Sequence, residues 1–119
     1  MKKESIIFIG TPKFAVKSLK VLVENDFNII GVITSLDKRK GRGRKISLSP
    51  VKEYAKKKKI PIYQPRNLKN LDFINKMKRI NPSLFVVVAF RMLPEVLTNI
   101  PENGTINLHS SLLPSYRGA

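Results

Sequence analysis

The sequence predicts an α/β fold built on a doubly wound, mostly parallel sheet within a single domain. Short apolar runs alternate with segments of helical periodicity along all 119 residues, which is the order of elements in such a sheet. The run at residues 85–89 is apolar at every position, as expected of a strand that helices cover on both faces. Hydrophobic residues make up 42% of the chain, enough to build one packed core.

The first strand is predicted at residues 5–9, a short apolar run. It leads into Gly10-Thr11-Pro12, where Gly10 permits a tight turn and Thr11 with Pro12 suits the cap and first position of a helix. Apolar residues at helical spacing, Phe14 among them, continue that helix. A second buried strand is predicted at residues 29–34.

The later elements follow the same alternation. Their helices are bounded by recognisable signals, Ser49-Pro50 at a start and Asn81-Pro82 at an end. The predicted elements are helices at 50–58 and 71–80, strands at 60–63, 84–90 and 104–108, and one or two helical turns at 94–97.

The chain is strongly basic, with 23 Lys plus Arg against 8 Asp plus Glu and a formal net charge of +15. Such an excess favours a polyanionic partner, although a solvated lysine surface needs no ligand. The charge is concentrated in one stretch without aliphatic anchors, which we expect to be a flexible basic loop. Its basic residues are Lys38, Arg39, Lys40, Arg42, Arg44 and Lys45.

Several function classes are disfavoured. Without cysteine the chain has neither a disulfide framework nor a cysteine-ligated metal site, and we expect no metal and a cytoplasmic protein. The longest apolar run, at residues 84–90, is too short to cross a membrane. Gly10 is not followed by the partner glycines of the dinucleotide fingerprint, so a nicotinamide cofactor is not expected.

Candidate catalytic residues stand where the last predicted strand ends. Ligands of parallel sheets gather outside the carboxyl ends of the strands. Asn107 and His109 are two positions apart, so both side chains point to the same face of that strand. An amide and an imidazole that converge could polarise a carbonyl and stabilise a tetrahedral oxyanion, and a purely structural histidine is the alternative.

Two motifs at this point resemble the signature of the folate-dependent formyltransferases, an Asn-x-His pair followed by Ser-Leu-Leu-Pro. They are Asn107-Leu108-His109 and Ser111-Leu112-Leu113-Pro114, and Tyr116-Arg117-Gly118 extends the match. The family resemblance implies a Rossmann-like catalytic domain and 10-formyltetrahydrofolate as co-substrate, with no metal.

The resemblance is closest to the methionyl-tRNA formyltransferase branch of this family. Residues 8–15 look like its opening motif, and residues 41–45, with Ser49-Pro50-Val51-Lys52 behind them, resemble the basic loop that grips the acceptor stem of initiator tRNA. The glycinamide ribonucleotide formyltransferases share the Asn-x-His pair but lack the long basic loop, so they are the alternative. A small basic RNA-binding module that uses residues 38–45 is a further one.

The resemblance also implies a role for each matched residue, in a reaction that passes the formyl group to the methionine of initiator methionyl-tRNA. The alternatives are a strand-end charge for Arg91 and core positions for Phe14, Leu112 and Leu113. The implied roles are catalysis for Asn107 and His109, folate binding for Arg91, Met92, Leu93, Ser111, Leu112, Leu113 and Pro114, tRNA binding for Lys38, Arg39, Lys40, Arg42, Arg44 and Lys45, and the aminoacyl end for Thr11, Pro12 and Phe14.

The family's catalytic domain continues past the Tyr-Arg-Gly motif to an aspartate that orients the histidine, and then to a C-terminal barrel. We therefore expect residues 1–119 to be an incomplete N-terminal catalytic domain that is inactive alone and monomeric when completed.

Overall fold

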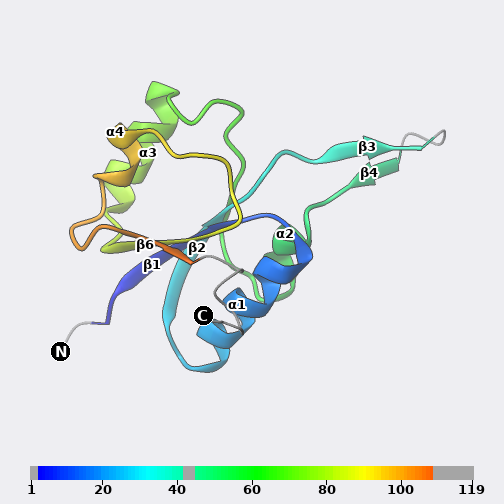
Figure 1. Cartoon of the computed structure of the whole chain (residues 1–119), viewed down its shortest axis with the longest axis horizontal. Coiled ribbons are helices and arrows are strands. Elements are labelled where there is room, and N and C mark those ends of the chain that lie inside the picture. The colour runs from blue at the N-terminus through cyan, green and yellow to red at the C-terminus, as the bar shows by residue number, and fades with distance from the viewer. Residues whose placement is uncertain (1–2, 42–44, 109–119) are drawn as a thin grey trace, which may run out of the picture.

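The computed structural model describes residues 3–41 and 45–108 (Figure 1). Its main sheet has five strands in the order β5-β2-β1-β6-β7, and every neighbouring pair is parallel. The predicted doubly wound parallel fold is therefore confirmed. The strands are β1 (Ser5–Gly10), β2 (Asn28–Ile33), β5 (Ile62–Tyr63), β6 (Leu84–Val88) and β7 (Thr105–Leu108).

Helices cover both faces of this sheet, as Figure 1 shows. Side chains of β1 alternate between the two faces. Ile6 and Phe8 pack with the helices α1 and α2, whereas Ile7 and Ile9 pack with α3 and α4. The helices are α1 (Lys13–Glu24), α2 (Pro50–Lys57), α3 (Leu71–Ile80) and α4 (Glu95–Thr98).

The order of the strands reverses beside β1. The chain moves from β1 outward through β2 to β5, then crosses back to β6 on the other side of β1. The carboxyl ends of β1 and β6 thus flank the point where ligands of doubly wound sheets usually bind.

The basic stretch is not a simple loop. Residues 38–40 and 45–47 form an antiparallel two-stranded sheet, β3 (Lys38–Lys40) with β4 (Lys45–Ser47). We call residues 38–47 the basic arm, because Figure 1 shows this hairpin projecting from the body of the molecule. Our expectation of a loop is wrong for residues 38–40 and 45–47, which pair as strands through backbone hydrogen bonds although their side chains do not alternate between apolar and polar.

Two predicted local features also differ. The cap of α1 is Pro12 and not Thr11, and it makes no side-chain capping bond, because the proline ring has no acceptor atom; the Thr11 hydroxyl pairs with Ser35. The strand predicted at residues 84–90 ends at Val88, since Ala89 has a φ of 53° in the left-handed region that strands do not use.

Candidate functional site

Four of the predicted site residues line one hollow at the carboxyl edge of the sheet. Asn107 contributes from β7, and Arg91, Met92 and Leu93 contribute from the segment after β6. The hollow has a volume of about 360 Å³. Its lining is completed by Val87, Phe90, Thr98 and Thr105. The other residues predicted for this site, His109, Ser111, Leu112, Leu113 and Pro114, lie outside the described part of the chain.

The register of β7 against β6 orients Asn107. Asn107 is the partner of Val87, and Thr105 is the partner of Phe85, so both polar residues share the sheet face that carries α3 and α4. The Thr105 hydroxyl donates a hydrogen bond of 2.9 Å to the carbonyl of Thr98. Thr105 therefore closes the wall of the hollow, whereas Asn107 is exposed at its mouth.

The segment from residue 89 to 93 forms the opposite wall. The left-handed Ala89 turns the chain sharply out of β6, a conformation that is strained for a residue with a Cβ. The Arg91 guanidinium donates to the carbonyls of Pro65 and Arg66 at 3.0 and 3.3 Å, and it lies 5.2 Å from the centre of the Phe90 ring. Arg91 thus ties two loops of this edge together.

Met92 and Leu93 differ in their surroundings. Met92 is 92% exposed, an unusual position for a large apolar side chain. Leu93 is half-buried against the core on the α3 and α4 face. A second hollow of about 660 Å³ lies between residues 66–69 and residues 91–94. Arg91, Met92 and Leu93 therefore line both hollows, with Met92 open to solvent.

The residues predicted for the aminoacyl end lie where β1 passes into α1. The Thr11 and Ser35 hydroxyls are 2.9 Å apart, and the backbone N–H of Ser35 donates to the Thr11 oxygen at 3.3 Å. Phe14 is 42% exposed, so it does not belong to the core. Pro12, which lies between Thr11 and Phe14 in the sequence, is half-buried. Thr11 thus joins the ends of two neighbouring strands.

The basic arm begins at this same edge, because β2 ends at Ile33, four residues before Asp37, and the arm follows directly. Lys38, Arg39 and Lys45 are exposed, and the backbone of Lys40 pairs with that of Lys45. Arg42 and Arg44 lie outside the described residues.

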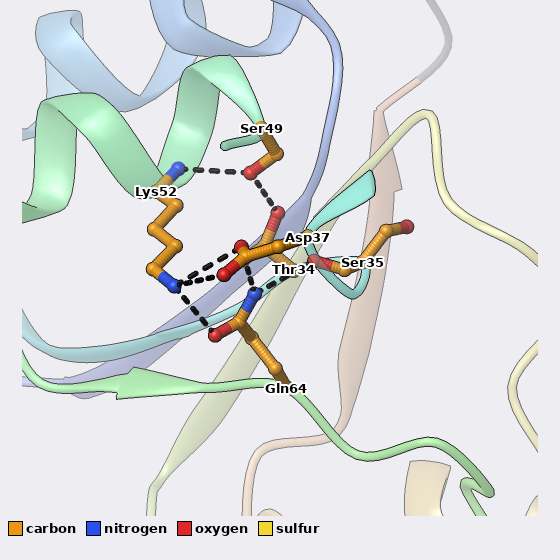
Figure 2. A network of polar contacts seen from close by, with 6 residues as sticks. All are labelled: Thr34, Ser35, Asp37, Ser49, Lys52 and Gln64. Carbon is orange, nitrogen blue, oxygen red and sulfur yellow. Dashed lines mark hydrogen bonds and ion pairs between the residues drawn. The ribbon is translucent and has the colours of Figure 1, made fainter. Parts of the chain in front are cut away.

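A polar network at the foot of the arm was not predicted as part of the site (Figure 2). Lys52 forms an ion pair with Asp37 at 2.9 Å, and Gln64 hydrogen-bonds to both. The hydrogen bonds from Lys52 and Gln64 hold the pKa of the Asp37 carboxyl below its usual range. The sequence contained one signal for this network, because Asp37 is a carboxylate placed directly before the cationic run.

Two general findings bear on other kinds of site. Among residues 3–41 and 45–108, no group of three or more histidine, cysteine or acidic side chains is placed to hold a metal ion. In the same part of the chain, no helix has both the length and the apolar character to span a membrane.

The sequence profile of the family described as Formyl transferase matches residues 3–119, and the chain belongs to that family. A solved structure of the phosphoribosylglycinamide formyltransferase from Coxiella burnetii, in complex with CHES, matches 98% of this chain and 56% of that one, with a TM-score of 0.60. At 18% identity, that match shows the shared fold.

Among curated relatives, the similarity is to methionyl-tRNA formyltransferases. The enzyme of Bacteroides fragilis is 54% identical over 121 residues, which cover 100% of this chain and 37% of the relative. The enzyme of Clostridioides difficile is 50% identical over 115 residues, which cover 96% of this chain and 37% of the relative. The chain thus spans little more than a third of the length of these relatives.

Proposed function

We propose that this chain is the N-terminal part of an enzyme that transfers the formyl group of 10-formyltetrahydrofolate to the methionine of initiator methionyl-tRNA. The observation that carries the proposal is the basic arm, which rises from the same sheet edge as the hollow containing Asn107. A small acceptor has no use for such an arm, whereas a tRNA presents phosphates along its stem. The names of the relatives agree with this choice.

The reaction begins with attack of the methionine amine on the formyl carbon. The carbonyl oxygen then carries negative charge in a tetrahedral intermediate, and the Asn107 amide is a donor that can stabilise it without transferring a proton. Breakage of the bond between the formyl carbon and the folate nitrogen completes the transfer. A proton lost by the amine replaces the formyl group on that nitrogen, and His109 is the residue we propose to assist this movement.

The proposed binding roles are those that the family resemblance implies. In the proposal, Arg91, Met92 and Leu93 hold the folate together with Ser111, Leu112, Leu113 and Pro114. The turn at Thr11 and Pro12, with Phe14 at the start of α1, lies beside the aminoacyl end. The cations of the basic arm contact the acceptor stem.

The test uses a hybrid enzyme, in which residues 1–119 are followed by the part of the Bacteroides fragilis relative beyond the matched stretch. Labelled 10-formyltetrahydrofolate is offered with either charged initiator tRNA or glycinamide ribonucleotide. We expect transfer to the tRNA-bound methionine alone, and its loss in a hybrid with Lys38 and Arg39 both changed to Gln. Transfer to glycinamide ribonucleotide would favour the other branch of the family, whose acceptor is small.

A further inference from the structure

The basic arm meets the body of the molecule at its foot. It leaves β2 through residues 34–37 and returns to α2 through residues 48 and 49. Among the side chains that the structure describes along its strands, Lys38, Arg39 and Lys45 are exposed and Ile46 is 64% exposed, so these four do not anchor the arm in the core. The direction of the arm must therefore be set by the contacts at its foot.

A closed triangle of side chains stands there, shown in Figure 2. The Nζ of Lys52 lies 3.0 and 2.9 Å from the two carboxylate oxygens of Asp37 and donates to Oε1 of Gln64 at 3.0 Å. The Gln64 amide nitrogen donates to Asp37 at 2.9 Å and to the Ser35 carbonyl at 3.0 Å. We call Asp37, Lys52 and Gln64 the clamp.

The clamp joins three separate parts of the fold. Asp37 immediately precedes β3, Lys52 is in the first turn of α2, and Gln64 immediately follows β5. The side chains of Lys52 and Asp37 are only 17% and 31% exposed, so neither ion is fully hydrated. A carboxylate that accepts three hydrogen bonds from two donor groups has one well-defined arrangement, unlike an isolated surface ion pair.

The returning side of the arm is fixed separately. The hydroxyls of Thr34 and Ser49 are 2.6 Å apart and buried. Ser49 also caps α2 by accepting the backbone N–H of Lys52 at 3.0 Å. Thr34 and Ser49 therefore hold the two ends of the arm together, and the clamp adds a third point of attachment that limits its swing.

We propose that Asp37, Lys52 and Gln64 are positioning residues that set the direction of the basic arm, and thereby where the RNA stem lies relative to the hollow with Asn107. This proposal rests on the proposed function for its RNA, but the rigidity of the arm does not depend on it. Ser35 connects the clamp to Thr11 at the end of β1, so the arm and the turn beside the aminoacyl end share one network.

Long-range electrostatics and a positioning role predict opposite effects of Asp37→Asn on RNA binding. Its carboxylate lies beside a run of cations, so its removal should strengthen RNA binding if only long-range electrostatics matter. If the carboxylate positions the arm, Asp37→Asn should instead weaken binding. Glu53→Gln is the matched control, because Glu53 is an exposed acid on α2 outside the clamp and the charge change is the same.

A second variant removes any change in charge. Gln64→Leu replaces a neutral side chain by another of similar size and deletes its hydrogen bonds to Asp37, Lys52 and Ser35. In the hybrid enzyme, we expect Asp37→Asn and Gln64→Leu each to raise the KM for charged tRNA about three- to tenfold, on the scale of coupled neighbouring residues. The KM for the formyl donor should stay unchanged, and Glu53→Gln should not raise the KM for tRNA.

The position of the arm is measured independently by a distance between two spin labels. The chain contains no cysteine, so labels enter at Ile46→Cys on the arm and Val21→Cys on α1, both exposed, with cysteines of the appended part changed to serine. We expect a wider distance distribution in Asp37→Asn and Gln64→Leu than in Glu53→Gln. Unchanged widths would overturn the proposal, whatever happens to the KM, and so would wider distributions with an unchanged KM for tRNA.

A failure of the proposed function would give a different pattern of results from a failure of the clamp. If Lys38→Gln with Arg39→Gln left the KM for tRNA unchanged, the arm would not be the RNA contact. The label distances would still report whether the clamp holds the arm.

Discussion

Replacement of Asn107 by Ala is the perturbation that bears most directly on the proposed chemistry. Asn107 lies at the mouth of the hollow, on the face of β7 that β6 and α4 enclose. Its amide can meet the developing oxyanion, whereas the substrates themselves are held by other groups in the proposal. The change should therefore act on the transition state and leave both substrate complexes almost intact.

The magnitude follows from the number of donors that are lost. Asn107→Ala removes one amide donor, and loss of one such donor typically costs about 2.7 to 4 kcal/mol, or roughly 100- to 1,000-fold in kcat. Thr105→Val is the matched control from the same strand face, because the Thr105 hydroxyl is already committed to the Thr98 carbonyl. It removes one ordinary hydrogen bond, which costs stability of about 1 kcal/mol and should change kcat by less than about tenfold.

The assay is steady-state formyl transfer by the hybrid enzyme, with both substrates varied in turn. We expect His109→Ala to fall at least as far as Asn107→Ala, and the double variant to fall by less than the product, since both residues act on one charge. A result in which Asn107→Ala raised the KM for the formyl donor and spared kcat would refute the reasoning. Asn107 would then be a binding residue.

Three further predictions concern binding and stability. Arg42→Ala with Arg44→Ala should weaken tRNA binding and reduce its salt slope by roughly one phosphate contact per charge removed, as titration at several salt concentrations measures. Gly10→Ala should lower the free energy of unfolding by about 1 to 3 kcal/mol in urea titrations, because its Cβ would lie 2.7 Å from a backbone oxygen. Gly31→Ala should lower it less, because the neighbour at 2.8 Å there is a tyrosine ring that can move. Hydrogen bonds from Asn103 and Ser83 lower the pKa of Glu4 in the folded state, so its contribution to stability is present above its unfolded pKa and lost as the pH falls through the folded value. Glu4→Gln should therefore flatten the acid side of a plot of Tm against pH.

The fold was predictable wherever local pattern and burial agreed. The helix at residues 71–80 begins and ends where its apolar spacing and Asn81-Pro82 predict, and Asn81 closes it in the left-handed conformation with a φ of 55°. The predicted strand at residues 84–90 extends two residues beyond the observed one, because Ala89 and Phe90 continue the apolar run. A pattern of apolar residues does not show where the backbone changes from negative to positive φ, as it does at Ala89.

The basic arm was not predictable as a hairpin from its own residues. Its strands carry cations without apolar alternation, and the clamp that fixes its foot joins residues distant in sequence. Asp37 and Gln64 are 27 positions apart, and Asp37 and Lys52 are 15 apart. The parallel pairing of β2 with β5 brings Asp37 and Gln64 together after the carboxyl ends of those strands, and the packing of α2 against β2 brings Lys52 to them.

The hollow was predictable in part, for a topological reason. Asn107 lies near the end of β7 and Arg91 follows the neighbouring parallel strand β6. Such strands end at the same edge, so a prediction of two strands already implied a shared site. The roles of Thr105 and Thr98 were not accessible in that way, because the hydrogen bond between them depends on how α4 packs over β7.

The strand order places the two halves of the proposed site on opposite sides of β1. The arm and its clamp belong to the half built by β2 and β5, whereas the hollow with Asn107 belongs to the half built by β6 and β7. A substrate that contacts both halves has to pass the end of β1, which lies between them. There the backbones of β1 and β6 are so close that a Cβ on Gly10 would meet the Val88 oxygen at 2.7 Å. Under the proposed function, a tRNA gripped by the arm therefore reaches the hollow by passing its aminoacyl end over the turn at Thr11 and Pro12.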